Sequence, residues 1–187
     1  MLDASSELFL EKSYEQVTLS EIAKKAKVGK GNIYTYFDRK EDILFTLMAD
    51  SFTEGITAVE EVISKGVMNS KEDFLNILQD LISAFLPYIE RIVKFTEQIA
   101  YLDDNVKPNK TYKGKSLQNL KDLITIMGNF CETGSKFCPV KNKKITSAQM
   151  GAIIIDIIGT NFRLAAIGEK TMSNEAIFLV VKRLFTP

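Results

Sequence analysis

The sequence predicts an all-α protein, and three observations lead to this fold class. Apolar residues recur at the three- and four-residue spacing of helices along nearly the whole chain. No segment of the sequence shows a convincing alternation of apolar and polar residues, which is the pattern of a half-buried strand. The helical spacing is interrupted at residues 104–113, where a proline and two asparagines cluster, and at residues 132–146, so loops are expected there.

The first helix is expected over residues 1–12. It carries Asp3, Glu7 and Glu11 among its apolar residues, which is unlike a signal peptide. The sequence also contains no run of 18 apolar residues, so no membrane partner is indicated. A cytoplasmic location is therefore expected.

Residues 18–40, TLSEIAKKAKVGKGNIYTYFDRK, are the most informative stretch. Thr18 and Glu21 have the spacing of a capping box, so a helix should begin directly after the threonine. Gly29 is a tolerated N-cap for a second short helix. Two short helices around a three-residue turn indicate a helix-turn-helix, whose second helix enters the major groove of DNA.

The side chains left exposed on the second helix have chemistry that suits DNA contact. Lys30 can neutralise a phosphate or donate to guanine, and Asn32 can pair with an adenine edge. Gly31 permits a close backbone approach, and nearby hydroxyls can donate to phosphate oxygens. The alternative is a plain helical hairpin in which Tyr34 and Tyr36 merely cover a core.

Charge is balanced over the 187 residues, with 24 basic and 24 acidic side chains, but it is uneven locally. Between residues 24 and 40 the only acidic residue is Asp38. A local basic cluster is the electrostatic footprint of a nucleic-acid binder and would make DNA affinity depend on salt. The six basic residues of this cluster are Lys24, Lys25, Lys27, Lys30, Arg39 and Lys40.

Residues 2–47 resemble the N-terminal DNA-binding domain of the TetR family of transcriptional regulators. The resemblance rests on a first helix ending in Glu-Leu-Phe, a Glu-Lys-x-Tyr turn, Thr-x-x-Glu-Ile-Ala, and Val-x-Lys-Gly-x-Ile-Tyr-x-Tyr-Phe-x-x-Lys-Glu. It implies a three-helix helix-turn-helix DNA-binding domain over residues 1–47, followed by a helical effector-binding and dimerisation domain over residues 48–187.

The resemblance also implies roles for individual residues. It assigns Phe9, Ile22, Ala23, Val28, Ile33 and Phe37 to the core of the first domain. Together with Asn32 from the pattern above, the DNA-binding residues are Thr18, Lys30, Gly31, Asn32, Tyr34, Thr35, Tyr36 and Lys40. Two departures from the family pattern matter. Ser13 stands where relatives usually have glycine and would cost about 1 kcal/mol at positive φ, and Arg39 replaces a hydroxyl cap, so Asp38 is expected to cap the fourth helix.

The remaining residues read as helices. Residues 43–63 predict a long helix that links the first domain to the rest of the chain. Residues 74–85 predict a helix that Pro87 ends, followed by another over residues 89–103. Helical spacing then returns over residues 117–131, 149–167 and 177–185.

The last two of these helices are the expected dimer interface. Residues 149–167 are apolar around nearly the whole helix circumference, and such a helix must be covered on every side. In relatives the last two helices pair with those of a second subunit as a four-helix bundle; the alternative is that residues 153–158 fill a monomer core. A homodimer would bind double-stranded DNA at an inverted repeat. The predicted interface residues are Ile153, Ile154, Ile157, Ile158, Ile177, Val180, Val181 and Leu184.

The middle helices are expected to hold a pocket for a small-molecule effector of unknown identity. Aromatic residues and a methionine suit such a pocket, although each also suits an ordinary core. Asn161, Asp156 and Arg163 are polar groups on an otherwise apolar helix, which either bond across the dimer or orient a ligand. The candidate ligand-binding residues are Tyr88, Phe95, Tyr101, Met127, Phe130, Asn161 and Phe162.

Other function classes fit less well. The chain has no histidine, no glycine-rich phosphate loop and no nucleophile elbow, so we expect neither an enzyme nor a cofactor. With two thiols alone a metal site is not expected either. The expected function is a repressor, because a dimer on a promoter palindrome blocks polymerase by occupancy. The alternatives are a helical adaptor that binds proteins and a redox-responsive regulator that uses Cys131 and Cys138.

Overall fold

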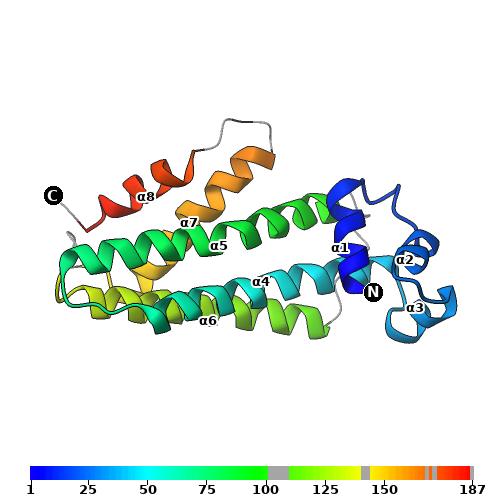
Figure 1. Ribbon diagram of the computed structural model, residues 1–187, viewed down its shortest axis with the longest axis horizontal. Coiled ribbons are helices and arrows are strands. Elements are labelled where there is room, and N and C mark those ends of the chain that lie inside the picture. The colour runs from blue at the N-terminus through cyan, green and yellow to red at the C-terminus, as the bar shows by residue number, and fades with distance from the viewer. Residues whose placement is uncertain (101–109, 140–143, 167–168, 170–171, 186–187) are drawn as a thin grey trace.

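The protein is helical throughout the part that the structure, a computed structural model, describes, which is residues 1–100, 110–139, 144–166, 169 and 172–185. This part holds eight helices and no strand, so the all-α prediction is confirmed (Figure 1). The helices are α1 (Leu2–Glu11), α2 (Leu19–Lys25), α3 (Lys30–Tyr36), α4 (Lys40–Lys65), α5 (Lys71–Ala100), α6 (Lys110–Gly134), α7 (Ser147–Ala166) and α8 (Asn174–Lys182).

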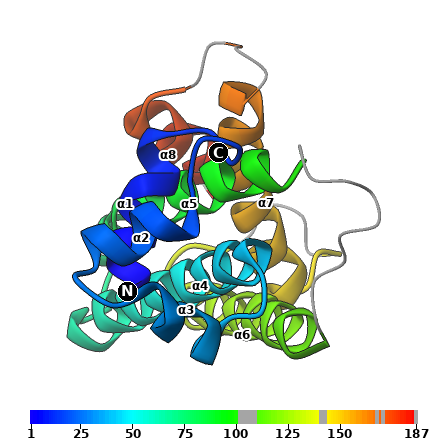
Figure 2. The same ribbon diagram turned by 90° about the vertical axis from the view of Figure 1, so that its right-hand side faces the viewer.

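The molecule is elongated, and its N-terminal helices form one end of it. Helices α1, α2 and α3 gather at this end, while α4 and α5 run together along the long axis (Figure 1). Helices α6 and α7 pack beside them, and α8 lies near the opposite end of α5. Viewed from the N-terminal end, α2 and α3 lie in front of the bundle (Figure 2).

Two separate apolar cores hold these parts together. The smaller core joins α1, α2 and α3 to the start of α4, and it includes Phe9, Ile22 and Ile33. The larger core joins α4, α5, α6, α7 and α8. The expected core residues of the first domain lie where the family pattern placed them, with Ala23 also buried and Val28 and Phe37 packed against the same cluster.

Helix α5 differs from the prediction at Pro87. The sequence pattern predicted a helix end there, but a single helix runs from Lys71 to Ala100 with Pro87 inside it. A proline removes one backbone hydrogen bond of the helix, to the carbonyl of Ser83. Both residues are exposed, and the apolar stripe on either side, including Phe85 and Ile89, is buried in the larger core. Tertiary packing therefore outweighs the local preference of proline, and the expected break was wrong.

Helix α6 also begins earlier than predicted. It starts at Lys110, so residues 110–113 of the expected loop are helical, while the earlier part of that loop lies outside the described residues. The helix continues to Gly134 and is followed by a turn closed by Cys138 N–H donating to the Gly134 carbonyl at 2.8 Å. The expected loop at residues 132–146 is thus shorter at its start than the sequence indicated.

Close backbone contact joins α6 and α7. A Cβ atom added at Gly151 would lie 2.7 Å from the Gly128 nitrogen and 3.1 Å from the Ile124 oxygen. Only glycine at this position allows the two helices to approach so closely. This crossing fixes α7 against the bundle.

Candidate DNA-binding face and effector cavity

The start of α2 is held by the predicted capping box. Thr18 Oγ1 accepts from the Glu21 backbone N–H at 3.2 Å, and the Thr18 N–H donates to the Glu21 carboxylate at 3.0 Å. The Thr18 hydroxyl also donates to this carboxylate at 3.1 Å. The helix therefore begins at Leu19 as predicted. Since the hydroxyl proton of Thr18 is already engaged by Glu21, a phosphate would have to compete for it.

The turn between α2 and α3 contains a strained residue that the sequence did not reveal. Lys27 has a φ of 56°, and among the described residues other than glycine it alone has a positive φ. This left-handed conformation costs a residue with a Cβ atom about 1–2 kcal/mol. The expected strain at Ser13 was wrong, because the chain leaves α1 with Lys12 extended, at a φ of −131°.

Helix α3 presents its polar side to solvent. Ile33 is fully buried, whereas Tyr34 is 52% exposed and Tyr36 is 74% exposed. Lys30, Gly31, Asn32 and Thr35 are exposed as well. The hairpin alternative required the two tyrosines to cover a core, and their exposure contradicts it. Helix α3, which carries these candidate DNA-binding residues, lies at the end of the molecule nearest the viewer in Figure 2.

Lys40 is placed differently from the other candidates. Its ammonium donates to the Tyr14 carbonyl at 2.6 Å and to the Val17 carbonyl at 2.8 Å, and it lies 3.7 Å from the centre of the Tyr14 ring. Burial lowers the pKa of Lys40. Two of its three donors hold the segment between α1 and α2 against α4, so its assignment to the DNA surface stays a prediction that depends on the third donor.

The residues around Lys40 complete this contact. The Tyr14 hydroxyl donates to Glu41 Oε1 at 2.5 Å, and burial, followed by the bond to Glu41, raises the pKa of Tyr14. The expected Asp38 cap was wrong, because the N-cap of α4 is Arg39 and no side chain caps it. Arg39 instead forms an ion pair with Asp42 at 2.9 Å.

Three of the six residues of the basic cluster already form contacts within the protein. Lys25 pairs with Glu7 at 2.7 Å, and Arg39 and Lys40 are engaged as described. Lys24, Lys27 and Lys30 are exposed and form no ion pair with any described residue. Lys24, Lys27 and Lys30 are therefore the members of the cluster that a phosphate beside α3 can meet without displacing a contact described above.

The predicted dimer residues separate into two groups. Ile154, Ile158, Ile177 and Val181 are buried in the larger core of the chain itself, so their assignment to the interface is corrected. The second group is at least partly exposed. It contains Ile153, Ile157 and Leu184, which are half-buried, Val180, which is 39% exposed, and its neighbour Leu179, which is 49% exposed and which the sequence analysis missed.

A cavity of about 540 Å³ lies between α4, α5, α6 and α7. Its wall is mainly aliphatic and aromatic, with Asp156 and Arg163 among its polar members. The Arg163 guanidinium bonds Asp156 at 3.0 Å and the Thr160 hydroxyl at 2.9 Å. The lining residues are Phe52, Phe85, Ile89, Ile92, Val93, Thr96, Glu97, Leu120, Leu123, Ile155, Asp156, Gly159 and Arg163.

The predicted ligand-binding residues do not line this cavity where they can be placed. Phe95 is in the smaller core, and Met127 and Phe130 are in the larger one. Phe130 stacks on Phe74 at 5.1 Å and lines a second cavity of about 420 Å³ near the far end of α4. Tyr88 is half-buried outside the lining of either cavity. Tyr101 and the side chains of Asn161 and Phe162 lie outside the described residues.

The two cysteines are buried rather than poised for redox chemistry. Burial raises the pKa of Cys131 to about 12 and also raises the pKa of Cys138. Cys138 Sγ lies 3.6 Å from the Phe185 carbonyl, in the larger core. Redox sensors depend on accessible thiolates, and neither thiol meets this requirement. Among the described residues no three potential metal ligands cluster, and no helix there is long and apolar enough to cross a membrane.

Comparison with known proteins identifies the N-terminal unit. The family described as "Bacterial regulatory proteins, tetR family" matches residues 1–47, which form α1, α2, α3 and the start of α4. Residues 1–47 therefore form a TetR-family N-terminal unit. TetR-family proteins are transcriptional regulators that bind DNA through a helix-turn-helix, and they are not enzymes.

One relative is similar in sequence over the N-terminal part of the chain, and solved structures are similar in fold over nearly its whole length. The chain is 42% identical to the fatty acid metabolism regulator protein of Bacillus subtilis (strain 168) over 65 residues, which are 35% of this chain and 34% of that protein. The match thus spans about a third of that relative's length. The fold is similar to FadR of Bacillus subtilis in complex with stearoyl-CoA, at 23% identity and a TM-score of 0.68, covering 99% of this chain and 96% of that one. It is also similar to the fatty acid degradation regulator FadR of Bacillus halodurans, at 17% identity and a TM-score of 0.70, covering 98% and 92%.

Proposed function

We propose that this TetR-family protein is a ligand-responsive repressor that binds a palindromic operator as a homodimer and is released by a small-molecule effector. The observation that carries the proposal is the polar outer face of α3, which is exposed while its opposite side, at Ile33, is fully buried. In the proposed division of the chain, residues 1–47 read DNA and residues 48–187 bind the effector and the second subunit.

DNA recognition is proposed to depend on α3. Lys30, Gly31 and Asn32 form its first turn, which is the part of a recognition helix that reaches base edges. Thr35 and the two exposed tyrosines lie further along it, where hydroxyl groups can donate to phosphate oxygens. Thr18, at the start of α2, adds a contact to the DNA backbone if its hydroxyl donates to a phosphate instead of to the Glu21 carboxylate.

Dimerisation is proposed through the outer sides of α7 and α8. Leu179 and Val180 are exposed apolar residues on α8, and Ile153 and Ile157 are the half-buried ones on α7. Burying such residues against a second copy would remove apolar surface from water. A two-fold axis there would present two α3 helices to two half-sites, and occupancy of a promoter by the dimer would block transcription.

The proposed effector carries a long apolar chain and an anionic head group, as an acyl-CoA does. The cavity of about 540 Å³ has a mainly apolar wall, and its size is within the range of about 300–1,000 Å³ that small-molecule sites occupy. Arg163 offers a guanidinium at its edge, which an anionic head group could take from Asp156. A FadR of similar fold is known in complex with stearoyl-CoA.

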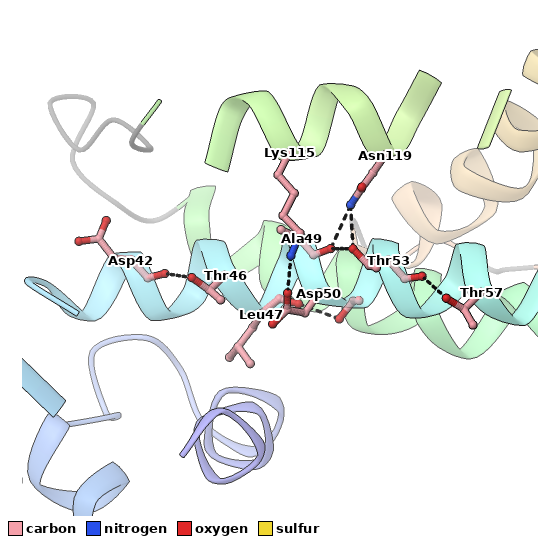
Figure 3. A network of polar contacts seen from close by, with 10 residues as sticks. Asp42, Thr46, Leu47, Ala49, Asp50, Thr53, Thr57, Lys115 and Asn119 are labelled. Carbon is pink, nitrogen blue, oxygen red and sulfur yellow. Dashed lines mark hydrogen bonds and ion pairs between the residues drawn. The ribbon is translucent and has the colours of Figure 1, made fainter. Parts of the chain in front are cut away.

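Release from DNA requires that the effector binds one arrangement of the helices better than the other. Helix α4 is the natural element to carry this difference, because it lies in both cores. Figure 3 shows how it is fixed: Asn119 of α6 donates to the Ala49 carbonyl at 3.2 Å and to the Thr53 hydroxyl at 3.1 Å, and Lys115 pairs with Asp50 at 2.8 Å. A ligand beside Leu120 and Leu123 would press on the same stretch of α6.

The test begins with duplexes selected from a random-sequence library by the full-length protein. We expect an inverted repeat, bound by a dimer, with an affinity that falls as salt rises. Tyr34→Ala and Lys30→Met should weaken binding, whereas Lys94→Ala, on the exposed side of α5, should not. Selection of no common sequence, or binding that survives both α3 substitutions, would contradict the proposed DNA-binding face.

The effector is tested separately with stearoyl-CoA as the probe. Stearoyl-CoA should lower the affinity for the selected duplex, and Arg163→Gln should weaken this response without changing DNA affinity in its absence. Free coenzyme A serves as the control, because it has the head group without the acyl chain. An equal response to coenzyme A alone would show that the apolar cavity is not the site of action.

A further inference from the structure

Helix α5 belongs to both cores of the molecule. Most of its length packs in the larger core, but Phe95, which is 0% exposed, lies in the smaller core with Phe9, Ile43 and Leu44. Ile99, one turn further, packs against the same cluster. The last two turns of α5 are therefore built into the DNA-binding unit rather than merely lying beside it.

A side-chain contact from α5 closes the end of α1. Gln98 Nε2 donates to the Phe9 carbonyl at 3.2 Å and to the Lys12 carbonyl at 3.1 Å. Helix α1 ends at Glu11, and the last carbonyls of a helix have no partner within the helix itself. The amide of Gln98 thus acts as a C-terminal cap for α1. It comes from far along the chain, 89 positions from Phe9 and 86 from Lys12.

The same two turns of α5 line the effector cavity. Val93, Thr96 and Glu97 are in its wall. Because successive residues of an α-helix are about 100° apart, residues 93 and 95, and likewise residues 96 and 98, point in nearly opposite directions. The cavity and the contact with α1 therefore occupy the two sides of one short stretch of helix.

From this juxtaposition we infer that Phe95 and Gln98 are positioning residues that couple the effector cavity to the DNA-binding unit through α5, in addition to the link that α4 provides. The inference rests on the proposed effector response. A ligand that displaces the wall at Val93 and Glu97 displaces the opposite side of the same turns. Close-packed cores resist continuous deformation. When these turns of α5 move, Phe95 therefore either moves the smaller core with it or loses its packing there. Gln98 moves with the same turns and shifts the end of α1 to which it is bonded.

Gly159 allows this coupling to be tested without knowing the effector. It lies in the cavity wall, and a Cβ atom built on it meets no described atom within 4 Å. Gly159→Phe should therefore fill part of the cavity and imitate a bound ligand. Gly159→Leu is a second version for the case in which phenylalanine disturbs folding.

The experiment is a double-mutant cycle on the full-length protein, read as the dissociation constant for the selected duplex. Four proteins are compared: wild type, Gly159→Phe, Gln98→Ala and the double variant. We expect Gly159→Phe to weaken binding by about 10-fold or more, within the range of ordinary allosteric coupling. In the Gln98→Ala background the same substitution should change affinity by less than about 3-fold, because the two sites interact. Phe95→Leu should behave as Gln98→Ala does.

A structural readout and a matched control accompany the cycle. Amide hydrogen exchange in α1 should quicken in Gly159→Phe and should no longer respond to it once Gln98 is replaced. Lys94→Ala is the control, because Lys94 lies on the same turns of α5 but is exposed. It should leave the effect of Gly159→Phe unchanged, and circular dichroism should confirm that every variant is folded.

The outcomes separate the two proposals. If both cavity-filling variants leave DNA affinity unchanged, the proposed effector response fails, and the coupling inference fails with it. If they weaken DNA binding equally with and without Gln98 and Phe95, the effector response stands and the coupling through α5 alone is overturned. Loss of the effect in the Lys94→Ala control as well would also overturn the assignment to these two residues.

Discussion

Lys40 allows the packing of the DNA-binding unit to be tested by a single substitution. Its ammonium holds two carbonyls of the segment between α1 and α2, at 2.6 and 2.8 Å, and lies over the Tyr14 ring. Lys40→Met retains most of the aliphatic stem while removing the charge and all donors. The two carbonyls then lose their partner, and the segment loses its attachment to α4.

The expected loss can be worked out from these contacts. Hydrogen bonds to a charged group contribute about 1.5–3 kcal/mol each, and a cation over an aromatic ring adds about 0.5–1 kcal/mol at a partly exposed site. The loss is smaller than this sum, because burial disfavours the charged amine, as its lowered pKa indicates, and water can reach the carbonyls. We expect a net destabilisation of about 2 kcal/mol, or about 4–8 °C in Tm for a chain of this size.

The assay is thermal unfolding followed by circular dichroism, with Lys30→Met as the control. Lys30 is an exposed lysine with no ion pair to a described residue, so its replacement should leave Tm unchanged. If Lys30 meets a phosphate, its replacement should instead reduce the slope of log K against log salt by about 0.9. Equal melting temperatures for wild type and Lys40→Met would refute the reasoning about Lys40.

Three further predictions concern stability. Lys27→Gly should raise the free energy of unfolding by about 1 kcal/mol by relieving the positive φ. Lys27→Ala removes the charge but not the strain, so it should not raise this free energy. If both variants change it equally in chemical denaturation, the charge and not the strain is the cause. Gly151→Ala should destabilise the protein by about 1–3 kcal/mol through its clash with the α6 backbone. Gly159→Ala, in open space on the same helix, should stabilise it by up to about 1 kcal/mol. A similar change in the free energy of unfolding for both variants would contradict the close crossing of α6 and α7. Because burial raises the pKa of Cys131 to about 12, the folded thiol keeps its proton where the unfolded one ionises, so stability is retained below the ordinary pKa and falls as pH rises toward 12. Cys131→Ala should flatten this fall in denaturation measured across alkaline pH, and an unchanged slope would count against the burial of that thiol.

Local sequence rules worked best where neighbours in the chain settle the structure. The Thr18 and Glu21 capping box set the start of α2, and the spacing around Ile33 set which side of α3 is buried. These interactions join residues a few positions apart, so a pattern of residues suffices to predict them. The family resemblance extended this to the smaller core, where Phe9 and Ile22 lie as expected.

The same rules failed where distant segments compete for a residue. Phe95 suited a pocket wall in the sequence, but its place is the DNA-binding unit. Pro87 suited a helix end, but the larger core holds α5 straight through it. Ile154 and Ile158 suited a dimer interface, and they fill the core of their own chain. Apolar spacing predicts that a residue is buried, but it does not predict which segment of the chain or which subunit buries it.

The sequence by itself determined the helical fold, the helix-turn-helix and the exposed polar side of α3, because each depends on short-range periodicity, capping and side-chain chemistry. Only the tertiary structure decided which basic residues remain available, which residues enclose the cavity, and how the two cores are joined. Those outcomes depend on contacts such as Lys40 with Tyr14 and Gln98 with the end of α1. They bring together residues 26 and 89 positions apart, and a separation of that size leaves no periodic pattern in the chain.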